Sequence, residues 1–230
     1  MLPSLPKIQY LILPIFLLQV TLYVTGKPES LSVLNVCYTI VLGVLLVLNT
    51  KLKGRFHKRV FYGLIISALG MIYFLMFQPR NTTVFSSLVF FVLPQIFYIN
   101  AFYLDFKSAP QLDKHGARIA IVLAFAISIA YYMLLRKELG ILKLPVMIGI
   151  FMTSLLFMMA AFRNLRVNKE SFRLILAAVL CYMVAEGTFA YHSFAHPIAG
   201  ILLVYSMFFL TALHLLVLGT ISRKLIHTDL

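Results

Sequence analysis

One carboxylate in this sequence could do chemistry in an unusual place. Glu186 lies about fifteen residues into an apolar stretch that starts at Ser171, with no Lys or Arg within a helical turn. A charge at that depth in a bilayer costs about 2.5–3.5 kcal/mol on insertion scales, so such residues usually face a bundle interior or a wet cavity. Burial in hydrocarbon also favours the neutral carboxylic acid. We therefore expect Glu186 to be a proton donor, the alternative being a neutral group that only bonds a neighbouring helix.

Other polar residues within apolar stretches are candidates to line the same cavity. Tyr182 lies one helical turn before Glu186 and shares its face, and Asn100 and Tyr103 share a face of an earlier stretch. We assign catalytic roles to Glu186, Tyr182, Asn100 and Tyr103, and substrate-binding roles to Tyr73, Gln95 and His214. At 1.5 Å per residue, Asn100 and His214 lie about 10 Å from the cytoplasmic interface, and Glu186 about 20 Å. Tyr73 and Gln95 are therefore the closer partners by depth.

The remaining chemistry-bearing residues do not form a recognised catalytic or metal motif. His192 and His196 have i, i+4 spacing, but Pro197 disfavours a helix at His196 and no third ligand is evident. A haem protein would need several histidines at span depth, and only His214 qualifies. The sequence has no nucleophile elbow and no Gly-rich phosphate loop. We predict neither a metal nor a cofactor.

Composition places these residues in a membrane. The chain of 230 residues is 62% hydrophobic and 12% charged, about half the charged share of soluble domains. A spanning helix needs about twenty mainly apolar residues, and that length predicts a single all-α membrane domain over residues 1–230. We expect eight spans, at about 8–25, 31–49, 60–77, 83–106, 117–135, 141–162, 172–191 and 198–221.

The basic residues predict an orientation rather than a nucleic-acid partner, despite a formal charge of +13. They lie at the ends of the apolar stretches, and fifteen of the 20 fall on one side of the predicted membrane. The positive-inside rule then places both termini in the cytoplasm. On that side Asp105 and Lys107 are expected to be solvated. The expected location is the bacterial inner membrane, and the sequence leaves open whether the chain forms a homo-oligomer.

Several stretches within the predicted spans carry short motifs. They are AEGTFA at 185–190 with Pro197 after it, the set Phe97, Asn100 and Tyr103, the stretch from Pro145 to Arg163, and residues 212–219. Together these resemble the YhhN-like, or lysoplasmalogenase, family of membrane proteins. Glu186 stands in place of the usual Asp of an acidic element, and Asn100 in place of His in a Phe-x-x-His-x-x-Tyr element. The stretch from Pro145 resembles the sixth span, and 212–219 resembles the closing element except for Leu213 where Gln is usual.

This resemblance implies hydrolysis of the vinyl-ether bond of a lysoplasmalogen, which releases a fatty aldehyde and a glycerophospho head group. The partner would be a membrane lipid that reaches the site laterally. Carbon protonation gives an oxocarbenium ion, so a buried acid such as Glu186 suits the reaction. One departure stands against it, because Gly70-Met71 lies where the family usually has Gly-Asp. Two alternatives stay open: a non-catalytic lipid-binding or regulatory protein of the same fold, and a small transporter in which Glu186 titrates.

Overall fold

The computed structural model describes residues 10–76, 83–108, 113–137 and 139–226. Within these residues the chain forms eight α-helices and one short 3-10 turn, with no strand. The helices are α2 (Ile12–Val24), α3 (Pro28–Thr50), α4 (Arg55–Met76), α5 (Thr83–Lys107), α6 (Lys114–Leu135), α7 (Lys143–Ala161), α8 (Lys169–Phe194) and α9 (Ile201–Ile221). Seven are long and apolar enough to cross a bilayer, and α2 is a shorter apolar helix. The predicted all-α membrane bundle is confirmed.

Local sequence signals explain several helix boundaries. Pro28 stands at the first position of α3, where its missing N–H costs no helical hydrogen bond. The Asp113 side chain caps α6 by accepting a hydrogen bond from the Gly116 backbone N–H at 3.0 Å. Gly200, with φ of 75°, supplies the left-handed turn that comes directly before α9. Pro94 lies inside α5, where it cannot donate a helical hydrogen bond.

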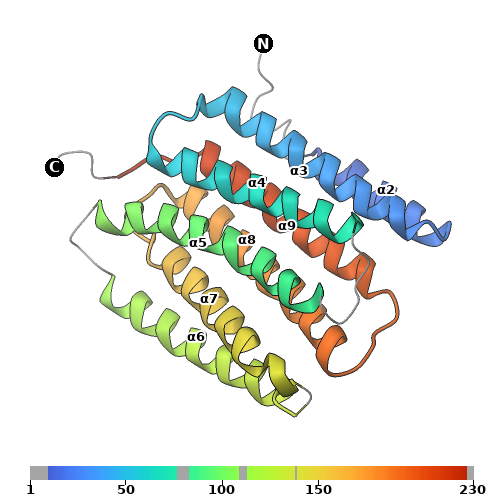
Figure 1. Cartoon of the computed structure of the whole chain (residues 1–230). Coiled ribbons are helices and arrows are strands. Elements are labelled where there is room, and N and C mark those ends of the chain that lie inside the picture. Colours follow the sequence, from blue (N-terminus) through green and yellow to red (C-terminus); the bar gives the residue numbers. More distant parts are fainter. Residues whose placement is uncertain (1–9, 77–82, 109–112, 138, 227–230) are drawn as a thin grey trace.

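The helices run roughly antiparallel to their chain neighbours, as Figure 1 shows, with α6 at one edge and α2 and α3 at the other. Helix α9 lies inside the bundle and packs most extensively against α8. Gly219 makes this packing close, because a Cβ there would lie 2.6 Å from Cγ1 of Ile175 on α8. The largest buried cluster contains side chains from every helix from α3 to α9. This core holds α8, which carries Glu186, in a fixed position.

A buried polar cluster holds the short helix α2 to the bundle. The Gln19 amide donates to Oδ1 of Asn35 at 3.2 Å and to the Ser206 hydroxyl at 2.7 Å. The Ser206 hydroxyl donates in turn to Asn35 Oδ1 at 2.7 Å, and all three residues are buried. Buried polar groups are costly unless they are hydrogen-bonded, so this cluster fixes α2 against α3 and α9. Gln19 and Asn35 therefore have a structural role and take no part in the hydrogen bonds to Glu186.

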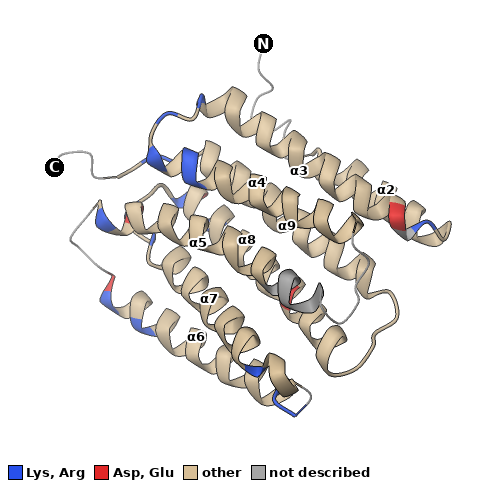
Figure 2. Cartoon of the chain, in the orientation of Figure 1, with Lys and Arg blue, Asp and Glu red and all other residues tan. Residues whose placement is uncertain are grey.

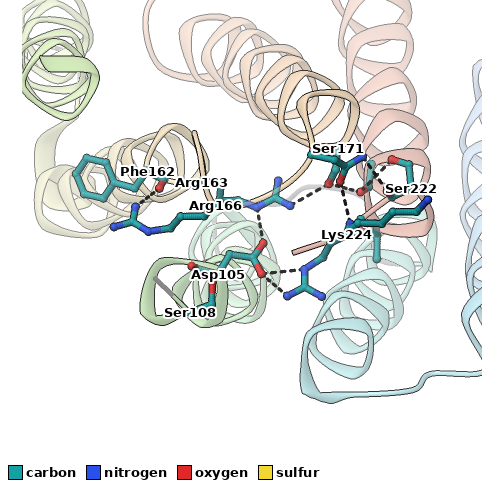
Figure 3. Close-up of polar contacts among 12 residues, drawn as sticks. Asp105, Ser108, Phe162, Arg163, Arg166, Ser171, Ser222 and Lys224 are labelled. Atoms are coloured by element: carbon teal, nitrogen blue, oxygen red, sulfur yellow. Dashed lines mark hydrogen bonds and ion pairs between the residues drawn. The ribbon is translucent and has the colours of Figure 1, made fainter. Parts of the chain in front are cut away.

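Most of the basic residues that the structure describes lie at one end of the bundle, as Figure 2 shows. Asp105 lies at that end, and the prediction that it is solvated is wrong. Asp105 is 0% exposed and pairs with buried Arg163 at 2.7 Å and with Arg223 at 2.8 Å (Figure 3). The Arg163 guanidinium also donates to the Ser171 hydroxyl at 3.0 Å. Span ends were expected to be hydrated, but here two arginines from distant segments cover the carboxylate. Lys107 is exposed, as expected.

Candidate functional site

The Glu186 carboxyl group is the centre of a polar cluster inside the bundle. The Gln95 amide of α5 donates to its two oxygens at 2.9 and 2.8 Å. The Thr153 hydroxyl of α7 lies 2.8 Å from Oε2 of Glu186. Three helices thus converge on one carboxyl group. Its interactions come from neutral groups, since no ion pair to Glu186 occurs among the described residues.

The hydroxyl of Thr153 can serve either protonation state of Glu186. It lies 3.0 Å from the Gly149 carbonyl oxygen as well as 2.8 Å from Glu186. A hydroxyl has one proton to donate and two lone pairs to accept with. If Thr153 donates to Gly149, it can accept the proton of a neutral Glu186; if it donates to Glu186, it stabilises the carboxylate. The cluster can therefore hold the acid before proton transfer and its conjugate base afterwards.

Glu186 faces a cavity of about 580 Å³, which falls within the range of small-molecule sites. Gln95, Thr153 and Glu186 line it together with mainly apolar side chains of α5, α6, α7 and α8. Phe74 of α4, Ser32 of α3 and Leu202 of α9 complete the lining. No Lys or Arg is among the lining residues that the structure describes. An uncharged lipid chain could lie here beside the acid.

Tyr182, predicted from its helical spacing, lies next to Glu186. It is buried one turn earlier on α8 and interacts electrostatically with the Glu186 carboxyl group. Its ring packs against Phe209 of α9, with ring centroids 5.7 Å apart. Tyr182 is not among the residues that line the cavity. It therefore lies near the acid but outside the cavity lining, and we regard it as a positioning residue.

Tyr131 is a site residue that the sequence reasoning missed. It comes from α6, lines the cavity and interacts electrostatically with Glu186. Its hydroxyl fits against α8 only because residue 187 is glycine: a Cβ on Gly187 would lie 1.4 Å from that oxygen. Tyrosines near span ends are usually interfacial anchors, so Tyr131 carried no distinctive signal. The adjacent Glu186-Gly187 pair was the available hint that another chain segment approaches α8 closely.

The structure does not bring the other predicted residues to Glu186. Asn100 is exposed, and its amide donates to the Ile96 carbonyl oxygen at 2.8 Å. Tyr103 is 49% exposed. Tyr73 packs on Phe90, with ring centroids 5.0 Å apart, and is not among the cavity-lining residues. The roles assigned to these three residues stay predictions without support from their positions.

His214 lies in a separate buried contact between α9 and α3. Its Nδ1 is 2.7 Å from the Tyr38 hydroxyl, and the two rings stack. His192, by contrast, lines the Glu186 cavity, and its Nδ1 accepts a hydrogen bond from the Ile198 backbone N–H at 2.8 Å. In the part of the chain that the structure describes, no three His, Cys, Asp or Glu side chains lie close enough together to hold a metal ion.

Comparisons with known proteins give one result that bears on these residues. Searches of curated proteins and of solved structures found no match. A sequence model described as the YhhN family matches residues 31–220, which include α4 to α8, most of α3 and α9, and every residue of the Glu186 cluster. The match covers far more than half of the chain. The protein is therefore an integral membrane protein that belongs to the YhhN family.

Proposed function

We propose that this protein is a membrane-embedded hydrolase that cleaves the vinyl-ether bond of a lysoplasmalogen-type lipid, with Glu186 as the acid. One observation carries the proposal: a carboxyl group held by neutral donors faces a largely apolar cavity of about 580 Å³. Because no basic side chain pairs with it among the described residues, the surroundings favour its protonated form. An acid in that state suits a reaction that begins with proton transfer to carbon.

The reaction proceeds by proton transfer followed by hydration. Glu186 gives its proton to the vinyl carbon farther from the ether oxygen, and the π electron pair forms the new C–H bond. The ether oxygen shares a lone pair with the other carbon, which gives an oxocarbenium ion beside the new carboxylate. Hydrogen bonds from Gln95 and Thr153 stabilise that carboxylate.

Water completes the hydrolysis by adding to the cationic carbon, and its released proton returns to Glu186. The resulting hemiacetal breaks at the bond to the glycerol oxygen, which takes up the hemiacetal hydroxyl proton. The products are a fatty aldehyde and a glycerophospho head group. In this proposal the water is oriented by the Tyr131 hydroxyl, a role supported by its close approach to Gly187 and its electrostatic interaction with Glu186. No metal is needed for these steps.

The non-catalytic alternative is favoured by one specific observation. Residue 71, where the family resemblance implies an acid, is Met71, and it packs against the core cluster rather than lining the cavity. Glu186 is thus the one acidic side chain among the described lining residues. A protein with this cavity but a single acid could bind a lipid without cleaving it.

The test is the release of fatty aldehyde by the purified protein. A vinyl-ether lysolipid should yield aldehyde, whereas the saturated alkyl-ether analogue should not, because it has no double bond to protonate. The measurement is the amount of aldehyde released from each lipid, compared with a control that contains detergent but no protein. Binding of both lipids without aldehyde from the first would favour the non-catalytic alternative and reject the hydrolase.

A further inference from the structure

The Glu186 cavity lies in one half of the bundle. It is lined by the first part of α7, at Val146, and by the last turns of α6 and α8, at Leu135 and Ser193. These helix ends lie opposite the connection 51–54 and the other basic segments (Figure 2). Ser193 lines the cavity and is also exposed. The cavity therefore reaches the surface at the end of the bundle that carries few basic residues.

The volume of the cavity matches one lipid chain better than two. A methylene group takes up about as much space as a water molecule, roughly 30 Å³. About 580 Å³ therefore holds on the order of twenty such groups. A single hydrocarbon chain with part of its glycerol fits within that number, and the two chains of an ordinary membrane phospholipid exceed it.

The surface end of the cavity offers a defined hydrogen-bond donor. The Nδ1 atom of His192 accepts from the Ile198 N–H at 2.8 Å, so the neutral ring carries its proton on Nε2. His192 lies six residues after Glu186, a rise of about 9 Å along α8. In a lysoplasmalogen, seven bonds join the carbon that is protonated to the phosphorus, about 8 Å at roughly 1.2 Å per bond of an extended chain. The rise along α8 between the two residues is therefore close to the length of lipid between the two groups, and both residues line the cavity.

Basic residues flank the same end. Arg136, Lys137 and Lys143 are exposed in and just after the connection between α6 and α7. That connection packs on the end of α8, because Leu135, Leu139 and Val146 form a buried cluster with partly buried residues around Phe194. Glu138 belongs to the same segment, so the segment 136–143 has three positive charges and one negative charge. The net charge beside the opening therefore suits an anionic group.

We propose that His192, together with Arg136, Lys137 and Lys143, forms a subsite for the phosphate of the bound lipid. The lipid then lies in the leaflet opposite the connection 51–54, with its phosphate at the surface and its chain beside Glu186. This placement deepens the proposed function and takes the lipid class from it. It concerns binding alone and needs no bond cleavage, so the two can be tested apart.

The experiment measures binding of an unreactive ligand to the purified full-length protein. The probe is a fluorescent single-chain alkyl-ether glycerophosphocholine, displaced by its unlabelled form, by a monoalkylglycerol of equal chain length, or by a two-chain phosphatidylcholine. One variant combines Arg136→Gln, Lys137→Gln and Lys143→Gln, and a second carries His192→Phe. The matched control combines Lys51→Gln, Lys53→Gln and Lys58→Gln, three exposed lysines at the opposite end.

Wild-type protein should bind the phosphate-bearing lipid at least about tenfold more tightly than the monoalkylglycerol, since one basic residue near a phosphate is worth about fivefold. The triple variant of Arg136, Lys137 and Lys143 should lose most of that preference, and so should His192→Phe. The triple variant of Lys51, Lys53 and Lys58 should keep it. The two-chain lipid should not compete. Equal binding of both single-chain ligands, or the same loss in the control, would overturn the subsite. Because the probe has no vinyl ether, neither outcome depends on catalysis.

Discussion

The carboxyl group of Glu186 shows how neutral residues can keep an acid usable inside a membrane protein. Gln95 contacts both of its oxygens and Thr153 contacts one, yet neither residue supplies a charge that would hold the carboxylate. A buried charge without a partner is expensive, whereas a neutral acid with hydrogen bonds is not. An arginine at either position would hold the group permanently ionised and remove its ability to donate a proton.

Replacement of Gly187 by alanine tests the placement of Tyr131. The added Cβ would lie 1.4 Å from the Tyr131 hydroxyl, so the ring must leave its position beside Glu186. Overpacking of this kind typically costs about 1–3 kcal/mol. We expect Gly187→Ala to lower the thermal unfolding temperature and the rate of aldehyde release.

Gly149→Ala is the matched control for Gly187→Ala, because Gly149 also lines the cavity but a Cβ there meets nothing within 4 Å. It should leave both measurements near wild type. The double variant Gly187→Ala, Tyr131→Ala should recover stability without recovering rate. Unchanged behaviour of Gly187→Ala alone would show that Tyr131 does not occupy this place.

Part of the site was predictable from single residues and part was not. Glu186 stands out because a carboxylate in an apolar stretch has no ordinary role there. Gln95 could be predicted as its partner because the two residues lie at similar depths in the membrane. Four other polar residues were also candidates but lie away from the acid: Tyr73, Asn100, Tyr103 and His214. The helices that carry them are apolar on nearly all sides. Periodicity therefore could not indicate which face meets the cavity. Thr153 and Tyr131 are residue types common in membrane helices and gave no signal.

At the scale of elements, length and hydropathy predicted the eight helices, and their ends differ by a few residues. Helix α3 begins at Pro28 rather than 31, and α6 at Lys114 rather than 117. Polar first turns extend the helices beyond the apolar stretches, because capping groups and the interface satisfy their backbone N–H groups. The first span is shorter than expected, Ile12–Val24 against 8–25, and residues 8 and 9 lie outside those described.

The cap of α6 gives a prediction about pH. Hydrogen bonding from the Gly116 backbone N–H lowers the pKa of Asp113 below its usual value, and Asn164 donates to the same carboxylate at 3.0 Å. A pKa that is lower in the folded state means that the folded protein binds fewer protons, so this contribution is present above the unfolded pKa of about 4 and is lost below it.

The thermal unfolding temperature of the wild type should therefore fall as the pH is lowered through 4. Asp113→Asn keeps an accepting oxygen but has no charge to lose, so its unfolding temperature should fall less over that interval. Two parallel pH profiles would contradict the assignment. His115 interacts with Asp113 electrostatically, so His115→Gln is the control that removes this neighbour and leaves the Asp113 carboxylate in place.

At the scale of the whole molecule, Asp105 links segments that are distant in sequence. It joins the end of α5 to Arg163 before α8 and to Arg223 after α9 (Figure 3). The guanidinium groups of both arginines also lie over the Phe56 ring. A backbone hydrogen bond from Ile226 to Arg166 at 3.0 Å holds the segment after α9 on the same connection. Hydropathy could not predict this cluster, because it depends on which helix ends meet.

Asp105→Asn should destabilise the whole bundle, because it leaves two arginines near each other with no carboxylate. Removing one partner of a buried ion pair typically costs about 3–5 kcal/mol. Lys107→Gln changes an exposed charge two residues away and should have little effect. Thermal unfolding in detergent compares the two variants. Equal unfolding temperatures would mean that the cluster does not stabilise the fold.

The most direct test of the central claim is aldehyde release by Glu186→Gln. Glutamine keeps the shape of the side chain but cannot give a proton to carbon. We expect release from a vinyl-ether lysolipid to fall by about 10²-fold or more, the usual contribution of general acid catalysis, while the unreactive alkyl-ether analogue still binds. Release at the wild-type rate by a folded, lipid-binding Glu186→Gln protein would contradict the account.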